Sequence, residues 1–354
     1  MAHNAGAPAD KLHRRAFVDI DLPAELTQKR RGEEARHRAT DNDGAPRTSA
    51  TVCSMHGRNR LIAGRHQSLL WARDRVHRGT LVPQLERAEI ERAKRKPTES
   101  LDAYDYFLRG MASYYQRTRE AINEALRLFY KAIELDPDFA SAYGMAAWCY
   151  GWRKINGWMI DRAQEIAETA RLARRAVELG PDDAVALSRG AHALGYVVGD
   201  LNAAATFIDR ALVLNPNLVG AWYASGWVRA YLGESEIAIR HFAHAMRLSP
   251  LDPHIIGMQA GTAFAHFLAG RYDEASSWAD MALWEQTNYL TPVLIAAASS
   301  ALARRLADAQ KFIARLRELD PALRLANVKD WGAFRRPEDL ARLKNGLQKA
   351  GLPE

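Results

Sequence analysis

The sequence predicts an all-α solenoid of about six helix-turn-helix repeats with a C-terminal capping helix. Similar segments of the type AIELDP recur along the chain, and they end at Pro137, Pro181, Pro216, Pro250, Thr287 and Pro321. Their spacings are 44, 35, 34, 37 and 34 residues. A period near 34 residues is typical of stacked helix pairs, because one pair alone cannot bury its apolar face.

The first eighty residues differ from the rest. Residues 1–100 hold 20 Lys and Arg against 13 Asp and Glu, whereas the remaining residues hold 29 of each. The net charge of +7 therefore comes from this end of the chain. Apolar residues in 1–80 follow no helical or alternating period, which predicts a basic and largely disordered segment. Residues 81–99 then predict a linker helix that ends at Pro97.

The repeats are predicted over 100–321, and the unit from Val219 to Asp252 shows the pattern best. Gly226 on its first helix lets the second helix approach closely, and Gly233 suits the left-handed conformation that ends a helix. Ala238, Phe242 and Ala245 follow at helical spacing. Pro250 ends the second helix. This arrangement resembles the consensus of the tetratricopeptide (TPR) repeat.

The second repeat and the residues after the last repeat depart from the 34-residue pattern. The unit between Pro137 and Pro181 is about ten residues longer than the 34-residue repeat period, and we assign its surplus to a lengthened helix or exposed loop within 152–163. Residues 322–354 no longer repeat and are predicted to cap the solenoid. Pro337 is expected to start a capping helix there and Gly351 to end it.

A narrower resemblance rests on three motifs: DAYDYFLRG (102–110), MRLSPLDP (246–253) and the C-terminal RRPEDLARLKNGLQKAGLPE (335–354). Over roughly 85–354 the chain resembles the C-terminal TPR-like region of bacterial class III adenylate/guanylate cyclases and related signalling regulators. The resemblance implies a sensor or interaction region in a signalling context. A cyclase domain needs far more than the 84 residues that precede the match, so this chain is expected to lack that domain.

Two other classes of function stay open as alternatives. In the first alternative the chain is a truncated and inactive relative of the cyclases. In the second it is a DNA-associated transcriptional regulator whose basic first hundred residues contact phosphates. The sequence favours neither, because no phosphate-binding or nucleophile motif occurs in a suitable context and the aromatic residues expected for nucleic-acid stacking are missing. We therefore expect no enzymatic activity, no cofactor, no metal site and no nucleic-acid partner.

The location of the protein follows from what the sequence lacks. Two cysteines cannot build a disulfide framework, and the N-terminus has no apolar signal-peptide core. The longest apolar run, 289–303, is too short to cross a membrane. These features predict a cytoplasmic protein without a membrane span.

We predict that a protein or peptide partner binds in the concave groove, because first helices line the groove in such a solenoid. The candidate groove residues are those at predicted outward positions of first helices: Arg189, His192, Tyr223, Arg229, Gln259 and His266. Trp152 and Trp158 in the lengthened unit form a possible exposed aromatic patch. Trp148, one turn before Trp152, is expected in the core.

Overall fold

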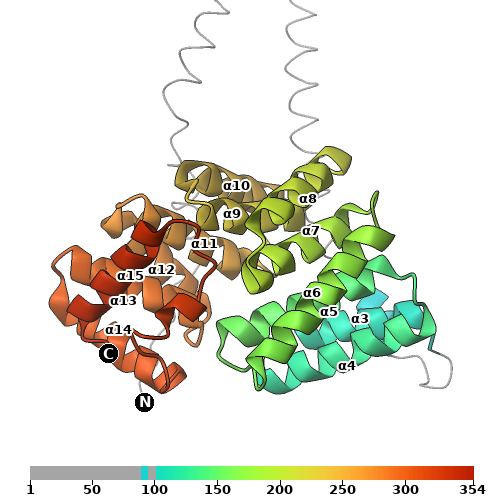
Figure 1. The fold of residues 1–354 in the computed structure, drawn as a ribbon, viewed down its shortest axis with the longest axis horizontal. Coiled ribbons are helices and arrows are strands. Elements are labelled where there is room, and N and C mark those ends of the chain that lie inside the picture. The colour runs from blue at the N-terminus through green and yellow to red at the C-terminus, as the bar shows by residue number, and fades with distance from the viewer. Residues whose placement is uncertain (1–88, 95–100) are drawn as a thin grey trace, which may run out of the picture. The chain divides into compact units, whose positions relative to one another are not determined.

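The computed structural model describes residues 89–94 and 101–354 (Figure 1). The predicted basic segment 1–80 lies outside the described residues, and so does most of the predicted linker 81–99. Residues 89–94 of that linker are helical. From 101 onward the described chain consists of helices and the turns between them.

Six helix pairs follow one another, which confirms the predicted TPR-like solenoid. The pairs are α3 (Ala103–Tyr114) with α4 (Arg119–Leu135), α5 (Ala140–Ile155) with α6 (Arg162–Leu179), α7 (Ala184–Ala193) with α8 (Leu201–Leu214), α9 (Val219–Tyr231) with α10 (Ser235–Leu248), α11 (Ile255–Leu268) with α12 (Tyr272–Glu285), and α13 (Leu290–Leu302) with α14 (Leu306–Leu319). A π-helical turn, η3 (Leu194–Val198), extends α7. The capping helix α15 (Pro337–Ala350) begins at Pro337 and ends before Gly351, as predicted.

The helices form two layers, as expected for a stack of repeats. The first helices α5, α7, α9, α11 and α13 contact each other in succession. Each second helix packs against its own partner and, where another pair follows, against the first helix of that pair. First helices are therefore enclosed on most sides. Every residue of α11 and α13 is buried or half-buried, whereas second helices keep one exposed polar face.

Close packing between helices depends on glycines at the contact points. A Cβ built on Gly226 would lie 2.6 Å from the ring of Phe242, and one on Gly261 of the next pair would lie closer still to the same ring. Phe242 itself is fully buried. One phenyl ring on α10 thus fills the space between α9 and α11, and only glycine leaves room for it.

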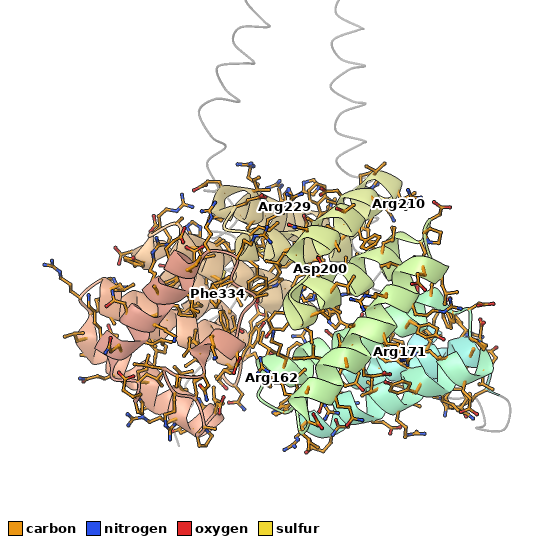
Figure 2. All side chains as sticks on the ribbon, in the orientation of Figure 1. Arg162, Arg171, Asp200, Arg210, Arg229 and Phe334 are labelled. Carbon is orange, nitrogen blue, oxygen red and sulfur yellow. The ribbon has the colours of Figure 1, made fainter. Side chains whose placement is uncertain are left out.

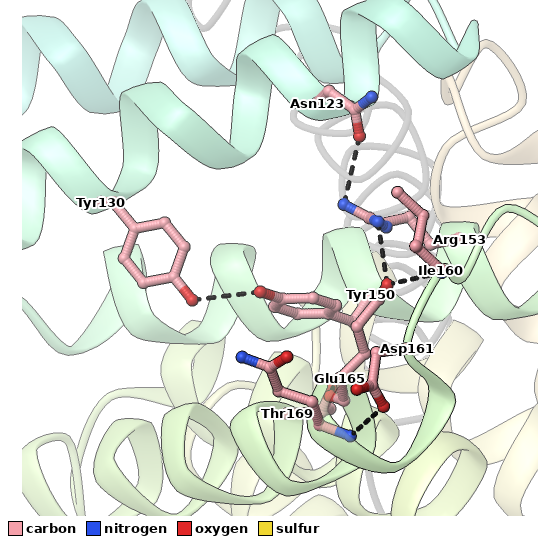
Figure 3. Close-up of polar contacts among 9 residues, drawn as sticks. Asn123, Tyr130, Tyr150, Arg153, Ile160, Asp161, Glu165 and Thr169 are labelled. Carbon is pink, nitrogen blue, oxygen red and sulfur yellow. Dashed lines mark hydrogen bonds and ion pairs between the residues drawn. The ribbon is translucent and has the colours of Figure 1, made fainter.

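The surplus of the second repeat is divided between helix and loop. Helix α5 continues to Ile155, and α6 has 18 residues. The loop between them is tied down by Glu165, whose Oε1 accepts hydrogen bonds from Arg153 Nη2 at 2.9 Å and from the Ile160 amide at 2.8 Å (Figure 3). Arg153 also donates to Asn123 of α4. A largely buried ion pair therefore fixes the longer connection.

The segment between α14 and α15 returns to the inner helices. The Tyr196 hydroxyl of η3 donates to the carbonyl of Trp331 at 3.0 Å, and the Arg335 amide donates to the carbonyl of Tyr231 at 3.0 Å. Phe334 packs edge-on against Phe264 of α11 with centroids 5.8 Å apart. The residues that precede the capping helix thus bound one side of the inner helix layer.

Candidate functional site

A pocket lined by aromatic side chains lies on the inner helix layer. Its cavity volume is about 30 Å³. Its wall comes from α5, from α7 and η3, from α9, and from the residue that precedes α13. The lining residues are Trp148, Gly151, Trp152, Ile155, His192, Tyr196, Tyr223, Trp227, Tyr231 and Tyr289. Four parts of the solenoid therefore build one concave site.

The rings of the pocket are held by contacts with each other. Trp148 stacks on His192 with centroids 4.5 Å apart, and Trp152 stacks on Tyr289 at 5.9 Å. Tyr196 stacks on Tyr231 at 5.7 Å with only 14° between the ring planes. Such offset stacks stabilise ring pairs beyond the burial of their area. The wall of the pocket is therefore largely preformed.

Tyr114 of α3 orients the two tryptophans from outside the pocket. Its hydroxyl oxygen accepts hydrogen bonds from the indole N–H groups of both Trp148 and Trp152, the latter at 2.6 Å. The side chain is fully buried, and burial raises the pKa of its phenol above the ordinary value. The neutral phenol therefore holds the N–H edge of each indole. The faces of the two indoles are left to contact the other rings.

Basic groups surround this aromatic cluster. The guanidinium of Arg189 lies 4.0 Å from the ring centre of Trp148, and that of Arg117 lies 5.6 Å from the ring centre of Trp152. The ammonium of Lys154 lies 4.6 Å from the ring centre of Tyr196 and donates to the Tyr196 carbonyl. Burial lowers the pKa of Lys154 to about 8. Cations above aromatic faces are attracted by the negative charge of the π system.

One carboxylate lies close to these basic groups. Asp252 Oδ1 is 3.0 Å from Nδ1 of His254 and also accepts the His254 backbone N–H at 2.8 Å. The ring of His254 lies within 6.1 Å of Tyr114, Trp148 and Tyr223. Burial lowers the pKa of His254, although Asp252 opposes this effect, so the imidazole is neutral near pH 7.

The structure brings together three of the six predicted groove residues. Arg189, His192 and Tyr223 lie around Trp148, and the last two line the pocket. The expectation that these side chains point outward is wrong for Arg189 and Tyr223, which are buried, because neighbouring first helices pack tightly there.

The other three predicted groove residues lie elsewhere. Arg229, labelled in Figure 2, pairs with Asp209 of α8 at 2.8 Å and with Glu234 at 3.0 Å. Its charge is therefore compensated by two carboxylates of neighbouring elements. Gln259 is buried within the layer of first helices rather than outward-facing. His266 is half-buried near the end of α11, and burial lowers its pKa. None of the three lines the aromatic pocket.

The predicted exposed patch of Trp152 and Trp158 needs correction as well. Both side chains are half-buried rather than exposed, because the longer α5 and the tied α5–α6 loop fold them against the core. Trp152 is a wall of the pocket, and Trp158 packs against the core without lining the pocket. Trp148 is buried as predicted, but it also lines the pocket.

Five residues of this site were not predicted from the sequence: Tyr114, Tyr196, Trp227, Tyr231 and Tyr289. Part of this set could have been found from the position of each residue within its repeat. Trp148, His192 and Trp227 each lie eleven residues after the proline that ends the preceding repeat (Pro137, Pro181 and Pro216). Trp152, Tyr196 and Tyr231 each lie fifteen residues after the same prolines. Three successive repeats thus place aromatic rings at the same two helical positions, four residues apart and on one face.

The described part of the chain contains neither a metal-binding cluster nor a helix that could cross a membrane. No group of three or more His, Cys, Asp or Glu side chains among those residues is arranged to hold a metal ion. Within the same residues, no helix combines the length and apolar character that a membrane crossing requires. Cys149 is buried with a free thiol, and burial raises its pKa.

Comparison with known proteins supports the fold. No protein-family model matches the chain, and no curated protein matches it significantly. Among solved structures, the human IFIT1 dimer with m7Gppp-AAAA is similar at 15% identity and a TM-score of 0.51, over 61% of this chain and 50% of that one. The APC/C hetero-tetramer Cut9-Hcn1 is similar at 18% identity and a TM-score of 0.49, over 75% of this chain and 46% of that one.

A third solved structure is covered almost completely. TTC0263, a thermophilic TPR protein of Thermus thermophilus, is similar at 18% identity and a TM-score of 0.43, over 56% of this chain and 98% of that one. This chain spans half or less of the IFIT1 and Cut9-Hcn1 chains. At these identities the likeness concerns the fold alone. None of these comparisons supports a link to the nucleotide cyclases.

Proposed function

We propose that this protein is an interaction module that binds a segment of a partner protein on the inner helix layer, with an aromatic or aliphatic side chain of the partner packed against the rings of the aromatic pocket. The observation that carries the proposal is the pocket itself, because seven Trp and Tyr rings from separate repeats converge on one concave site. Aromatic-lined concave sites supply large contact area at low cost in side-chain entropy.

A binding role fits the chemistry of the site better than a catalytic one. The pocket walls contain aromatic and apolar groups together with His192, whose pKa burial lowers to about 3. Such an imidazole is uncharged near neutral pH, and it is stacked on Trp148. The groups that line the pocket therefore offer surface and shape rather than proton transfer.

The test is selection of peptides from a displayed random library on the full chain, followed by affinity measurements on two variants. Tyr289→Ala removes one wall of the pocket, and we expect it to weaken binding at least tenfold. Trp284→Ala is the matched control, because this residue lies outside the pocket and is 89% exposed. It should leave the affinity unchanged. The proposal fails if Trp284→Ala abolishes binding and Tyr289→Ala does not.

A further inference from the structure

One wall of the pocket is formed by a contact between repeats that are not neighbours. Trp152 belongs to the second helix pair and Tyr289 directly precedes the sixth, and their rings stack with centroids 5.9 Å apart. The other walls lie on α5, α7, η3 and α9, and these elements pack on one another in succession. In a solenoid each repeat normally contacts only its neighbours. The contact of Trp152 with Tyr289 is therefore a seam at which the solenoid meets itself.

Arg117 in the α3–α4 turn bridges the same parts of the chain. Its Nη2 donates a hydrogen bond to the carbonyl of Pro253 before α11, and its Nη1 lies 3.4 Å from Oε1 of Gln286 after α12. The guanidinium carbon also lies 5.6 Å from the ring centre of Trp152. One side chain therefore links the first helix pair to the two loops that precede α11 and α13, and it does so beside the seam.

This link depends on side chains and loops more than on packed helices. The rings of Tyr114 and Tyr115, at the end of α3, lie with centroids 6.1 Å and 6.0 Å from that of His254. The main helix contacts of α3 and α4, in contrast, are with each other and with α5. The link can therefore separate while each helix pair stays intact, because a solenoid bends by small rotations between its repeats.

Burial of the Arg117 guanidinium opposes the closed state. The residue is half-buried and forms no ion pair within the described part of the chain, and its Nε is buried without a hydrogen-bond partner there. Burying a charged group with incomplete compensation costs free energy, and this cost disappears when the group returns to water. Two hydrogen bonds and a cation–π contact act in the other direction. The closed state is thus a balance of small terms.

The closed pocket is too small for a side chain of the partner. Its cavity volume is about 30 Å³. A cavity of that size has room for about two water molecules. The faces of Trp152 and Tyr289 that stack on each other become accessible only when the two rings separate. Neighbouring first helices pack directly on one another, so the seam is the place where the wall can open.

We propose that Arg117 is a clasp that holds the solenoid closed across the seam, and that the partner segment reaches the aromatic rings when the clasp opens. This control acts on the site of the proposed function and therefore rests on that proposal. In the open state the Arg117 guanidinium is in water, and the partner's side chain packs between the separated faces of Trp152 and Tyr289. The apparent dissociation constant of such a partner equals the intrinsic one divided by the open fraction of molecules.

Distances between two spin labels, measured by electron paramagnetic resonance, test the clasp without a ligand. Gln116→Cys and Thr287→Cys place the labels on exposed residues of the α3–α4 turn and of the loop after α12. Cys53→Ser leaves Cys149, which is buried, as the only native cysteine. The full chain should show one dominant short distance. Arg117→Gly should increase the population at longer distances about fivefold or more, which corresponds to the loss of one net hydrogen bond. An unchanged distribution would overturn the inference.

Two further variants separate the clasp from general loosening of the turns. Arg304→Gly is the matched control, because Arg304 has a similar positive φ (64° against 57° for Arg117) but is exposed and lies at the end of α13 opposite Tyr289. Its distances should be those of the unaltered chain, and an equal shift would overturn the inference. Gln286→Ala removes one acceptor and keeps the turn, so it should shift the distances in the same direction by less. Should Arg117→Gly lose its helices by circular dichroism, Gln286→Ala decides the test.

Library peptides whose affinity depends on Tyr289 connect the clasp to the proposed function. Arg117→Gly should bind them about fivefold or more tightly than the unaltered chain, since more of its molecules are open. Arg304→Gly should bind them with unchanged affinity. Equal or weaker binding by an Arg117→Gly protein with an open seam would overturn control by the clasp and leave the proposed function intact. If the distances show the clasp but the peptides depend on Trp284 instead of Tyr289, the proposed function fails and the clasp alone stands.

Discussion

At the scale of single residues, Gly261 leaves the least room for a Cβ among the described glycines. Its substitution by Ala would drive a Cβ into the ring of Phe242, in a core where that ring cannot move away. We expect Gly261→Ala to lower the free energy of unfolding by about 1–3 kcal/mol, the usual range for overpacking. Urea unfolding of the full chain measures the effect.

Gly151 supplies the matched control for this prediction. It also lies within a first helix, but a Cβ there would meet nothing closer than Tyr196 Cδ1 at 3.8 Å, an ordinary contact. Gly151→Ala should therefore raise the free energy of unfolding by about 0.5–1 kcal/mol through the helix preference of Ala over Gly. If both substitutions raise the free energy of unfolding, helix propensity rather than packing decides at Gly261.

At the scale of elements, the turns within the helix pairs share one backbone feature. Each contains a residue with positive φ: Arg117, Gly157, Gly199, Gly233, Gly270 and Arg304. A left-handed conformation costs about 1–2 kcal/mol for a residue with a Cβ. Two of the six turns thus carry an arginine where glycine would fit without strain.

Substitution of these two arginines by glycine is expected to change the stability of the protein differently. Arg304 is exposed, so we expect Arg304→Gly to raise the free energy of unfolding by about 0.5–1 kcal/mol, after the extra chain entropy of glycine is subtracted. Arg117 donates to the Pro253 carbonyl and to Gln286, and Arg117→Gly would lose both contacts. It should therefore stabilise less or destabilise. Thermal unfolding of both variants checks the pair, and a destabilised Arg304→Gly protein would contradict the argument.

The elements also show which features of the fold and of the pocket could be predicted from the sequence. The repeat phase, the capping helix and the contact of Gly226 with Phe242 could be predicted, because these positions recur wherever one helix packs on the next. The pocket could not be predicted as a whole. Tyr289 lines it and Tyr114 supports its tryptophans from outside, although the two belong to repeats far apart in the sequence. The π-helical turn that carries Tyr196 has no simple sequence signal.

The predicted groove residues illustrate the same limit. Helical periodicity places a residue on a face, but the pairing of that residue depends on the neighbouring helices. Arg229 is on a first helix as expected, yet Asp209 and Glu234 from the flanking elements take up its charge. Arg189 forms no ion pair within the described part of the chain and lies against Trp148 instead. Equal residue types at similar positions therefore have different roles.

At the scale of the whole described solenoid, buried histidines connect stability to pH. Burial is the largest cause in each case: it lowers the pKa of His192 to about 3 and that of His241 to about 4, and it also lowers the pKa values of His254 and His266. In the unfolded chain these imidazoles titrate near pH 6.5. Below that pH the unfolded state binds more protons than the folded state, so acid favours unfolding.

We therefore expect the free energy of unfolding to fall as the pH is lowered from about 6.5 to about 4, by up to about 1.4 kcal/mol per pH unit for each histidine that stays neutral in the folded state. His192→Gln removes one of these groups, so it should reduce the slope by about one proton in the window around pH 5. Urea unfolding across this range measures the slope. Arg304→Gly is the control, because its effect on stability should not change with pH. Equal stability at about pH 5 and about pH 7 would contradict the prediction, since it would require the folded chain to take up as many protons as the unfolded one.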